Sequence, residues 1–181
     1  HDKALAGSER AEVLYGLGES MRRLGEHQAA VPLLTEAAQV DPASPLPLRA
    51  LAKLHEDRSE WGDVVKVKKR RLDVATGQER FDLLIEIGDV FLNKLSDRTL
   101  ASKTYVAALE EKPDDRRLLT RLMQLYSEEK DWAKLVDVVV RLADFVEDPK
   151  QRAKYMHTAA IVSSRQMNER KQALVYYDRA T

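Results

Sequence analysis

The sequence repeats itself at a spacing of 71 residues, and this periodicity limits the folds open to the chain more strongly than any other feature. Trp61 and Trp132 are separated by that spacing, and each follows an acidic residue. Each tryptophan precedes a similar apolar run, at 64–67 and 135–138. Such a period is typical of a chain built from stacked copies of one supersecondary unit. Further matches at this spacing are Leu24 with Leu95, Ala30 with Ala101, Ala37 with Ala108, Pro42 with Pro113 and Leu51 with Leu122.

Within each period the apolar residues follow a helical pattern. Leu118, Leu122 and Leu125, for example, lie on one face of a predicted helix. Prolines at 42, 113 and 149 end the preceding segments, because proline lacks a backbone donor. Acidic residues at 114–115 and 147–148 offer caps to the helices that follow. The sequence predicts first helices over 9–24, 45–57, 79–94, 115–129 and 150–166, and second helices over 27–40, 61–75, 98–112, 132–147 and 170–181.

The first unit carries small residues where two helices must approach closely. Gly18 and Ala30 lie within one helix pair, and Ala37 faces the next unit. Pro42 then stops the second helix. With Leu17, these positions resemble the defining pattern of the tetratricopeptide repeat (TPR) family, whose period is about 34 residues. The third unit repeats the pattern with Ile87, Gly88, Ala101, Tyr105, Ala108 and Pro113.

The second and fourth units depart from the family pattern. Val64 and Leu135 replace the expected small residue, and Arg71 and Leu142 stand where alanine is expected. This alternation of regular and degenerate units resembles that of long bacterial repeat arrays. We expect residues 1–181 to form a single TPR-like solenoid piece of a longer protein. Its units are 9–43, 44–77, 78–113, 114–148 and 149–181, the last one truncated.

The resemblance implies a fold and a function. The implied fold is all-α, a right-handed α-α superhelix of five helix-turn-helix units whose first helices line a concave groove. The implied function is a protein-interaction scaffold that binds a peptide or helix of a partner, and the groove's alternating charges suit a partner segment of mixed charge. The expected groove residues are Tyr15, Glu19, Arg22, Arg49, Lys53, Asp82, Asp89, Asn93, Arg117, Gln124, His157 and Arg165. Two alternatives stay open: an RNA-binding helical repeat, and a regulatory arm of a larger enzyme or sensor.

One partner class of the family is excluded. A subgroup holds the acidic C-terminal tails of chaperones in a clamp of Lys, Asn and Arg. A carboxylate ligand would be repelled by several side chains at the corresponding positions here, so we do not expect that partner. These positions are Tyr15, Glu19, Ala50, Asp82 and Glu86.

The composition excludes several other kinds of protein. The 30 basic and 30 acidic side chains balance, which argues against a nucleic-acid module and against adhesion to an anionic membrane. Cysteine is absent, so disulfides, thiolate metal ligands and a cysteine nucleophile are not available. No apolar run is long enough for membrane insertion. We expect no enzyme activity and no cofactor.

Three local features have interpretations in terms of stability. The histidines, at 1, 27, 55 and 157, are too widely spaced to predict a metal site, and His55 is interpreted as a packed, hydrogen-bonded residue. The basic run at 66–71 is interpreted as a solvated outer face. Trp61 and Trp132 are interpreted as packing against the preceding helix, with a partner anchor as the alternative.

The last predicted helix carries apolar residues that no following unit within the sequence covers. They are Leu174, Val175, Tyr176 and Tyr177. Because solenoids need capped ends, we expect self-association through this helix. A cytoplasmic location is favoured, with targeting signals outside these residues.

Overall fold

The structure, a computed structural model, describes residues 2–180 and the side chains of residues 7–180. These residues form ten α-helices and no strand, which confirms the predicted all-α repeat of helix pairs. The first helices of the pairs are α1 (Asp2–Arg23), α3 (Leu46–Asp57), α5 (Gly77–Asn93), α7 (Arg116–Glu129) and α9 (Pro149–Arg165). The second helices are α2 (His27–Val40), α4 (Trp61–Leu72), α6 (Arg98–Glu111), α8 (Trp132–Asp144) and α10 (Arg170–Ala180).

Most helix ends lie within two residues of their predicted positions, and three do not. Helix α1 begins at Asp2 rather than at residue 9, because the alanines and leucine before residue 7 favour a helix. Helices α4 and α8 end three residues earlier than predicted, at Leu72 and Asp144. The apolar residues that extended these two predictions, among them Val146, instead lie in the following turns.

The turn inside each helix pair has the same backbone geometry in all five pairs. Two residues before each even-numbered helix, the backbone adopts a positive φ between 55° and 82°. Only one of these five residues is a glycine, although non-glycine residues adopt this conformation at a cost. An acidic residue follows each, where its charge favours the positive end of the next helix. The five dipeptides are Gly25-Glu26, Ser59-Glu60, Ser96-Asp97, Lys130-Asp131 and Asn168-Glu169.

Four aspartates cap helices, and two of them, Asp115 and Asp148, were predicted to do so. The Asp115 carboxylate accepts a hydrogen bond from the Leu118 backbone N–H at 2.8 Å, and Asp148 caps α9 in the same manner. Asp97 caps α6 and Asp131 caps α8. Such caps satisfy backbone donors that the first turn of a helix leaves unpaired.

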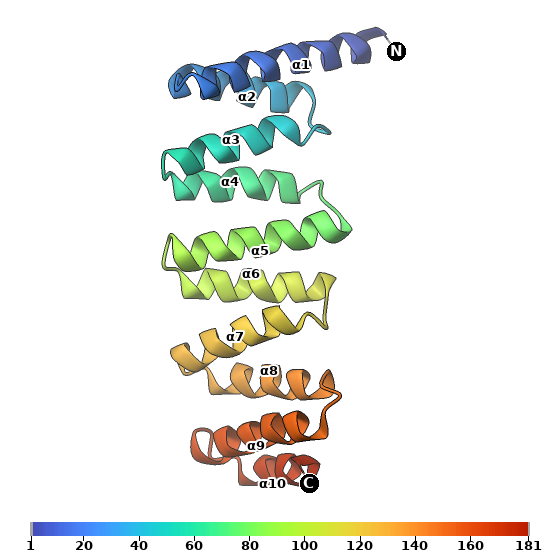
Figure 1. Cartoon of the computed structure of the whole chain (residues 1–181), viewed down its shortest axis with the longest axis vertical. Helices are drawn as coiled ribbons and strands as arrows, with labels where there is room; N and C mark the ends of the chain where they lie inside the picture. Colours follow the sequence, from blue (N-terminus) through green and yellow to red (C-terminus); the bar gives the residue numbers. More distant parts are fainter. Residues whose placement is uncertain (1, 181) are drawn as a thin grey trace. The chain divides into compact units, whose positions relative to one another are not determined.

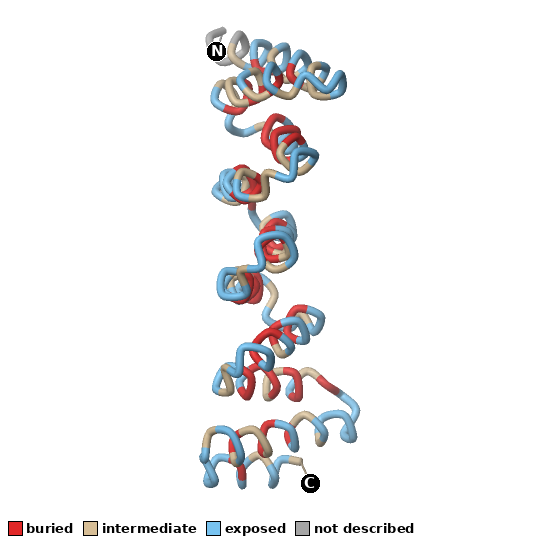
Figure 2. The backbone as a smooth tube through the Cα atoms, turned by 90° about the vertical axis from the view of Figure 1, so that its left-hand side faces the viewer, coloured by how far each residue is buried: buried red, intermediate tan, exposed pale blue. Residues whose placement is uncertain are grey.

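The chain divides into two compact units, His1–Thr104 and Tyr105–Thr181, with the boundary inside α6. In the first unit, α1 to α5 run in alternating directions across the view, and each packs on the next (Figure 1). Its core lies between successive helices and includes Ala30, Leu34, Leu51 and Leu54. The buried residues of this unit accordingly lie on the sides of its helices that face their neighbours (Figure 2).

The second unit contains α7 to α10, again packed in sequence order. Leu119 and Leu122 of α7, Leu142 of α8 and Met156 of α9 are at most 2% exposed. The same apolar stripe that predicted α7 therefore forms the core of this unit. Each unit therefore buries apolar residues of its own, and the polar faces of its helices remain for contacts with solvent or ligands.

Candidate functional site

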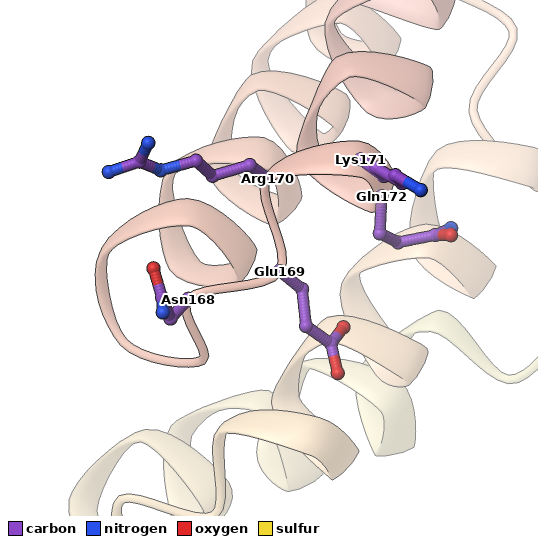
Figure 3. A pocket seen from close by; sticks show the side chains of 5 residues that line it. All are labelled: Asn168, Glu169, Arg170, Lys171 and Gln172. Atoms are coloured by element: carbon purple, nitrogen blue, oxygen red, sulfur yellow. The ribbon is translucent and has the colours of Figure 1, made fainter.

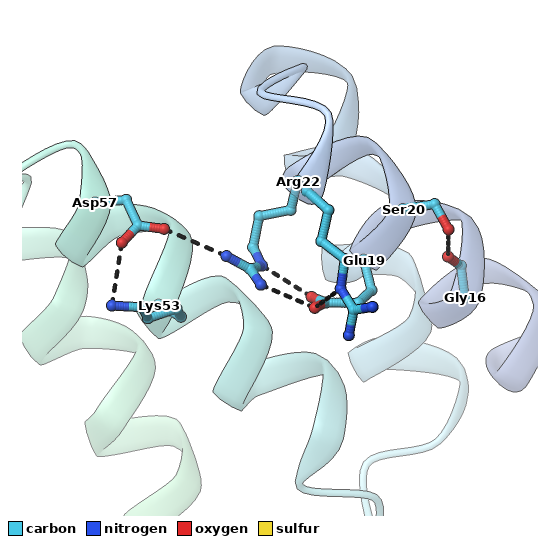
Figure 4. Close-up of polar contacts among 7 residues, drawn as sticks. Gly16, Glu19, Ser20, Arg22, Lys53 and Asp57 are labelled. Atoms are coloured by element: carbon cyan, nitrogen blue, oxygen red, sulfur yellow. Dashed lines mark hydrogen bonds and ion pairs between the residues drawn. The ribbon is translucent and has the colours of Figure 1, made fainter.

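The clearest polar cluster on the predicted groove residues joins α1 to α3 in the first unit (Figure 4). The Arg22 guanidinium donates two hydrogen bonds to the two Glu19 carboxylate oxygens, both at 2.8 Å. Its other terminal nitrogen contacts Asp57 of α3 at 3.3 Å, and Lys53 contacts Asp57 at 3.1 Å. Glu19, Arg22 and Lys53 are among the predicted groove residues, and the structure brings them into one cluster.

The cluster holds its charges in fixed positions. Hydrogen bonds from Arg22, which has the larger effect, and from Arg23 lower the pKa of Glu19 from its ordinary value of 4.5 to about 2. Glu19 in turn raises the pKa of Arg22. Three cations, those of Arg22, Arg23 and Lys53, surround the two carboxylates of Glu19 and Asp57. The cluster therefore carries one positive charge in excess.

A second cluster joins three helices at the other end of the first unit's odd-numbered helices. The Glu79 carboxylate, in the first turn of α5, accepts hydrogen bonds from Arg71 of α4 at 3.0 Å and from Arg49 of α3 at 3.1 Å, both at Oε1. These two guanidinium groups, that of Arg71 first, lower the pKa of Glu79. Arg49 was predicted as a groove residue, whereas Arg71 and Glu79 were not. A sequence cannot show that two arginines 22 residues apart share one carboxylate.

The remaining predicted groove residues of this unit lie on α1 and α5. Tyr15 is half-buried and packs against the core of the unit. Asp82 is exposed and accepts a hydrogen bond from Gln78 at 2.6 Å. Asp89 is half-buried and Asn93 exposed, further along α5.

In the second unit the predicted groove residues lie on α7 and α9. Arg117 and Gln124 are exposed on α7, where Gln124 donates to Glu128 at 3.0 Å. His157 of α9 is exposed too, and its ring meets that of Tyr177 of α10 edge-on with 5.5 Å between centroids. Arg165 is exposed at the end of α9. These residues lie in a different unit from Glu19 and Arg22, so they do not belong to the Glu19–Arg22–Asp57–Lys53 cluster.

The basic run at 66–71 is only in part the solvated face that the sequence suggested. Lys68 is 7% exposed, and its ammonium group contacts Glu86 of α5 at 2.6 Å and Glu56 of α3 at 3.2 Å. Lys66 matches the prediction, because it is exposed and pairs with Asp63 within its own helix. The burial of Lys68 could have been predicted from the helical period. Lys68 follows the buried Val64 by four residues, and residues four apart lie on the same face of a helix.

Each tryptophan is half-buried at the start of its helix. The Lys94 ammonium group, from the turn after α5, lies 4.7 Å from the centroid of the Trp61 ring. This is a cation–π contact, to which both the packing of the ring and the charge contribute. Trp61 therefore contacts the segment that follows α5.

One histidine–carboxylate group could hold a metal ion. Potential ligand atoms of His55, Glu60 and Asp63 all lie within 4.8 Å of one another. His55 Nδ1 and Glu60 Oε2 are 2.7 Å apart, which confirms the hydrogen-bonded histidine expected from the sequence. Arg58 and Lys66 already pair with the two carboxylates, so a cation would have to displace them. His1 lies outside the described residues.

Two of the hollows on the surface of the described residues are large enough to hold a small ligand. One, of about 740 Å³, lies at the turn between α9 and α10, where the side chains around it point in different directions (Figure 3). The other, of about 470 Å³, lies in the first unit between the α2–α3 turn and the α4–α5 turn, which are on the same side of α3 and α4 (Figure 1).

Among the described residues, no helix combines the length and apolar character that crossing a bilayer requires.

No protein-family model matches the chain, and a comparison with curated proteins finds no similar sequence. Solved structures of MamA are similar to it. One MamA crystal structure gives a TM-score of 0.52 at 14% identity, over 95% of this chain and 90% of that one. A MamA RS-1 double mutant gives 0.51 at 20% identity, over 94% and 92%. YrrB, a TPR protein with an unusual peptide-binding site, resembles the chain more weakly, with a TM-score of 0.49 at 15% identity over 92% and 82%. In fold, the described chain is thus an all-α, tetratricopeptide-like repeat protein.

Proposed function

We propose that this protein is an interaction scaffold and that it binds a peptide or helix of a partner protein on its odd-numbered helices. The observation that carries the proposal is the Glu19–Arg22–Asp57–Lys53 cluster, which joins α1 to α3 through a chain of ion pairs. Stacked helix pairs expose extended surfaces of this kind, and binding is their usual role.

The cluster has two properties that suit a binding surface. Glu19 holds the Arg22 guanidinium in one orientation, so less side-chain freedom is lost when a ligand binds. Arg23 and Lys53 are 75% and 59% exposed and bring the excess positive charge to the surface. An acidic residue of the partner would pair with them.

On α5, the next odd-numbered helix, the surface charge is negative instead of positive. Asp82 and Asp89 of α5 provide acidic positions for a basic residue of the partner. A partner segment of mixed charge, with its acidic part near α1 and α3, would therefore match the first unit. In the second unit, Arg117, Gln124 and Arg165 offer a separate surface for the same kind of ligand.

The test is a selection from a displayed library of random peptides, followed by NMR mapping of a selected peptide on the labelled protein. We expect shifts on α1, α3 and α5. The double variant Arg23→Glu, Lys53→Glu should weaken binding at least about tenfold, because a like charge then faces the acidic part of the peptide. Arg70→Glu, an exposed change on α4, is the matched control and should leave the affinity unchanged.

Three results would count against the proposal. The first is a failure to select any peptide that binds in solution. The second is a set of shifts confined to the even-numbered helices. The third is tight binding of single-stranded RNA at physiological salt that the selected peptides cannot displace, which would favour the RNA-binding alternative.

A further inference from the structure

The hollow between the α2–α3 and α4–α5 turns combines apolar walls with an arginine. Pro42, Pro45, Leu48 and Val74 line it, together with Arg71 and Glu79. Leu48 is buried, whereas Val74 is 63% exposed although it is apolar. Its volume, about 470 Å³, lies in the range of about 300–1,000 Å³ that is typical of ligand sites.

The charges at this hollow do not balance. The single carboxylate of Glu79 accepts hydrogen bonds from both Arg71 and Arg49, so two guanidinium groups share one anion. Arg71 is held tightly, with a side chain that is 11% exposed. Its Nε–H is buried and has no hydrogen-bond partner among the described residues. The donors of Arg71 are thus not used up within the protein, and the cluster has one positive charge in excess.

We propose that this hollow is a binding site for a carboxylate that is attached to a small branched apolar group. The apolar group would lie against Pro42, Pro45, Leu48 and Val74, and the carboxylate would pair with Arg71. A second carboxylate neutralises the excess charge, and arginine pairs with carboxylates at short, charge-assisted hydrogen bonds. A neutral ligand of the same shape would leave that charge uncompensated.

This site is separate from the surface proposed for partner binding. It lies at the turns, and the residues that line it were not among the predicted groove residues. Arg49, a predicted groove residue, contacts Glu79 but does not line the hollow. The site can therefore be tested without any partner peptide.

The probe is 4-methylpentanoate, titrated into the labelled full chain and followed by NMR. We expect saturable shifts at the two turns around the hollow, with a dissociation constant of about 1 mM for so small a ligand. The uncharged amide, 4-methylpentanamide, should bind at least about tenfold more weakly, because it cannot replace the charge-assisted hydrogen bond. Equal dissociation constants for the acid and the amide would overturn the proposal. Chemical-shift changes only at residues outside the two turns would overturn it too.

Two substitutions in the cluster should change the affinity in opposite directions. Arg71→Gln removes the cation and should weaken binding of 4-methylpentanoate at least about tenfold. Glu79→Gln removes the competing carboxylate and should strengthen binding by about threefold to tenfold. A merely structural cluster would lose affinity in both variants, so a weaker Glu79→Gln complex contradicts the proposal.

A third variant guards against misfolding of Arg71→Gln. Val74→Glu places an acidic group on the exposed wall of the hollow and should abolish binding while leaving the fold intact, with Arg70→Gln as the unaffected control. N-acetyl-leucine, the counterpart of an apolar residue at the end of a polypeptide, identifies the source of the carboxylate. Tighter binding of N-acetyl-leucine than of 4-methylpentanoate favours a polypeptide, and the reverse order favours a free organic acid. Undiminished binding to Val74→Glu overturns the site.

Discussion

At the scale of single residues, the important polar contacts of the first unit connect one helix to another. Lys68 lies on α4 but contacts carboxylates of α3 and α5. A charged group with so little exposure is stable only when it is paired, because its transfer from water is costly. Lys68 therefore contributes to the cohesion of neighbouring helices rather than to the surface.

This contact gives a prediction about stability. Lys68→Ala should lower the free energy of unfolding by about 1–3 kcal/mol, because Glu56 and Glu86 lose their shared cation and the packed side chain is removed. The measurement is urea unfolding followed by circular dichroism. Lys66→Ala, two residues away on the exposed face, is the control and should change stability little. Equal losses in the two variants would contradict a special role for Lys68.

The lowered pKa of Glu19 gives a prediction about pH. Because the pKa falls from 4.5 to about 2 on folding, the ionised carboxylate contributes stability that is fully present above pH 4.5. That contribution is lost as the pH falls from 4.5 towards 2. The wild type should therefore be more stable than Glu19→Gln at neutral pH, and the difference should shrink near pH 2. Urea unfolding of both proteins across this range checks it, and a constant difference would show that Arg22 does not hold the carboxylate.

The residues of the candidate site show what a sequence can and cannot predict. The repeat register correctly predicted that Glu19, Arg22 and Lys53 lie on first helices. Arg71 and Glu79 were missed because register says nothing about contacts between a second helix and the following unit. Lys68 was grouped with its basic neighbours, although its position four residues after Val64 placed it on the buried face.

At the scale of helices, the small residues of the repeat pattern have unequal roles. A methyl group added at Gly18 would lie 2.7 Å from Leu34 Cγ, a distance that requires the helices or the leucine to move. At Gly16, on the same helix, an added methyl group would meet no atom within 4 Å. The pattern that identified the family therefore marks Gly18 as a point of close approach between α1 and α2.

Substitution by alanine should consequently have opposite effects at these two glycines. Gly18→Ala should destabilise the protein by roughly 1–2 kcal/mol, since overpacking of Leu34 outweighs the gain in helix propensity. Gly16→Ala should stabilise it by up to about 1 kcal/mol, from helix propensity alone. Thermal unfolding of the two variants beside the wild type is the measurement. If Gly18→Ala is also stabilising, α1 and α2 are less closely packed than the structure shows.

The helix ends were predictable wherever a proline or an acidic cap marked them. Pro42 and Pro113 follow α2 and α6 closely, and Asp115 and Asp148 cap the next helices as expected. The ends of α4 and α8 could not be predicted, because apolar residues continue past each helix into a turn that is itself partly buried. Apolar periodicity shows which face is buried, but it does not show where the backbone leaves the helix.

At the scale of the whole molecule, the last helix exposes more apolar surface than the other second helices. Leu174 is 62% exposed, Val175 49% and Tyr177 37%. Neighbouring apolar side chains on one short helix favour association with another surface. Tyr177 is also held in place by its contact with His157.

We predict self-association through α10. Sedimentation velocity over a range of concentrations should show a species larger than the monomer, and Leu174→Glu should shift the equilibrium to monomer by at least about tenfold. Val106→Glu, which charges an exposed apolar position on α6, is the control and should have no effect. A monomer at every concentration, or an unchanged equilibrium in Leu174→Glu, would refute the prediction.

The left-handed backbone position two residues before each even-numbered helix has a consequence for recognising related proteins. Glycine, serine, lysine and asparagine all occupy this place, so the five turns share a torsion angle and not a side chain. A comparison of sequences does not detect this shared feature, whereas a comparison of backbone conformations does. Remote homologues of this protein should therefore be recognisable by a left-handed backbone position two residues before each second helix.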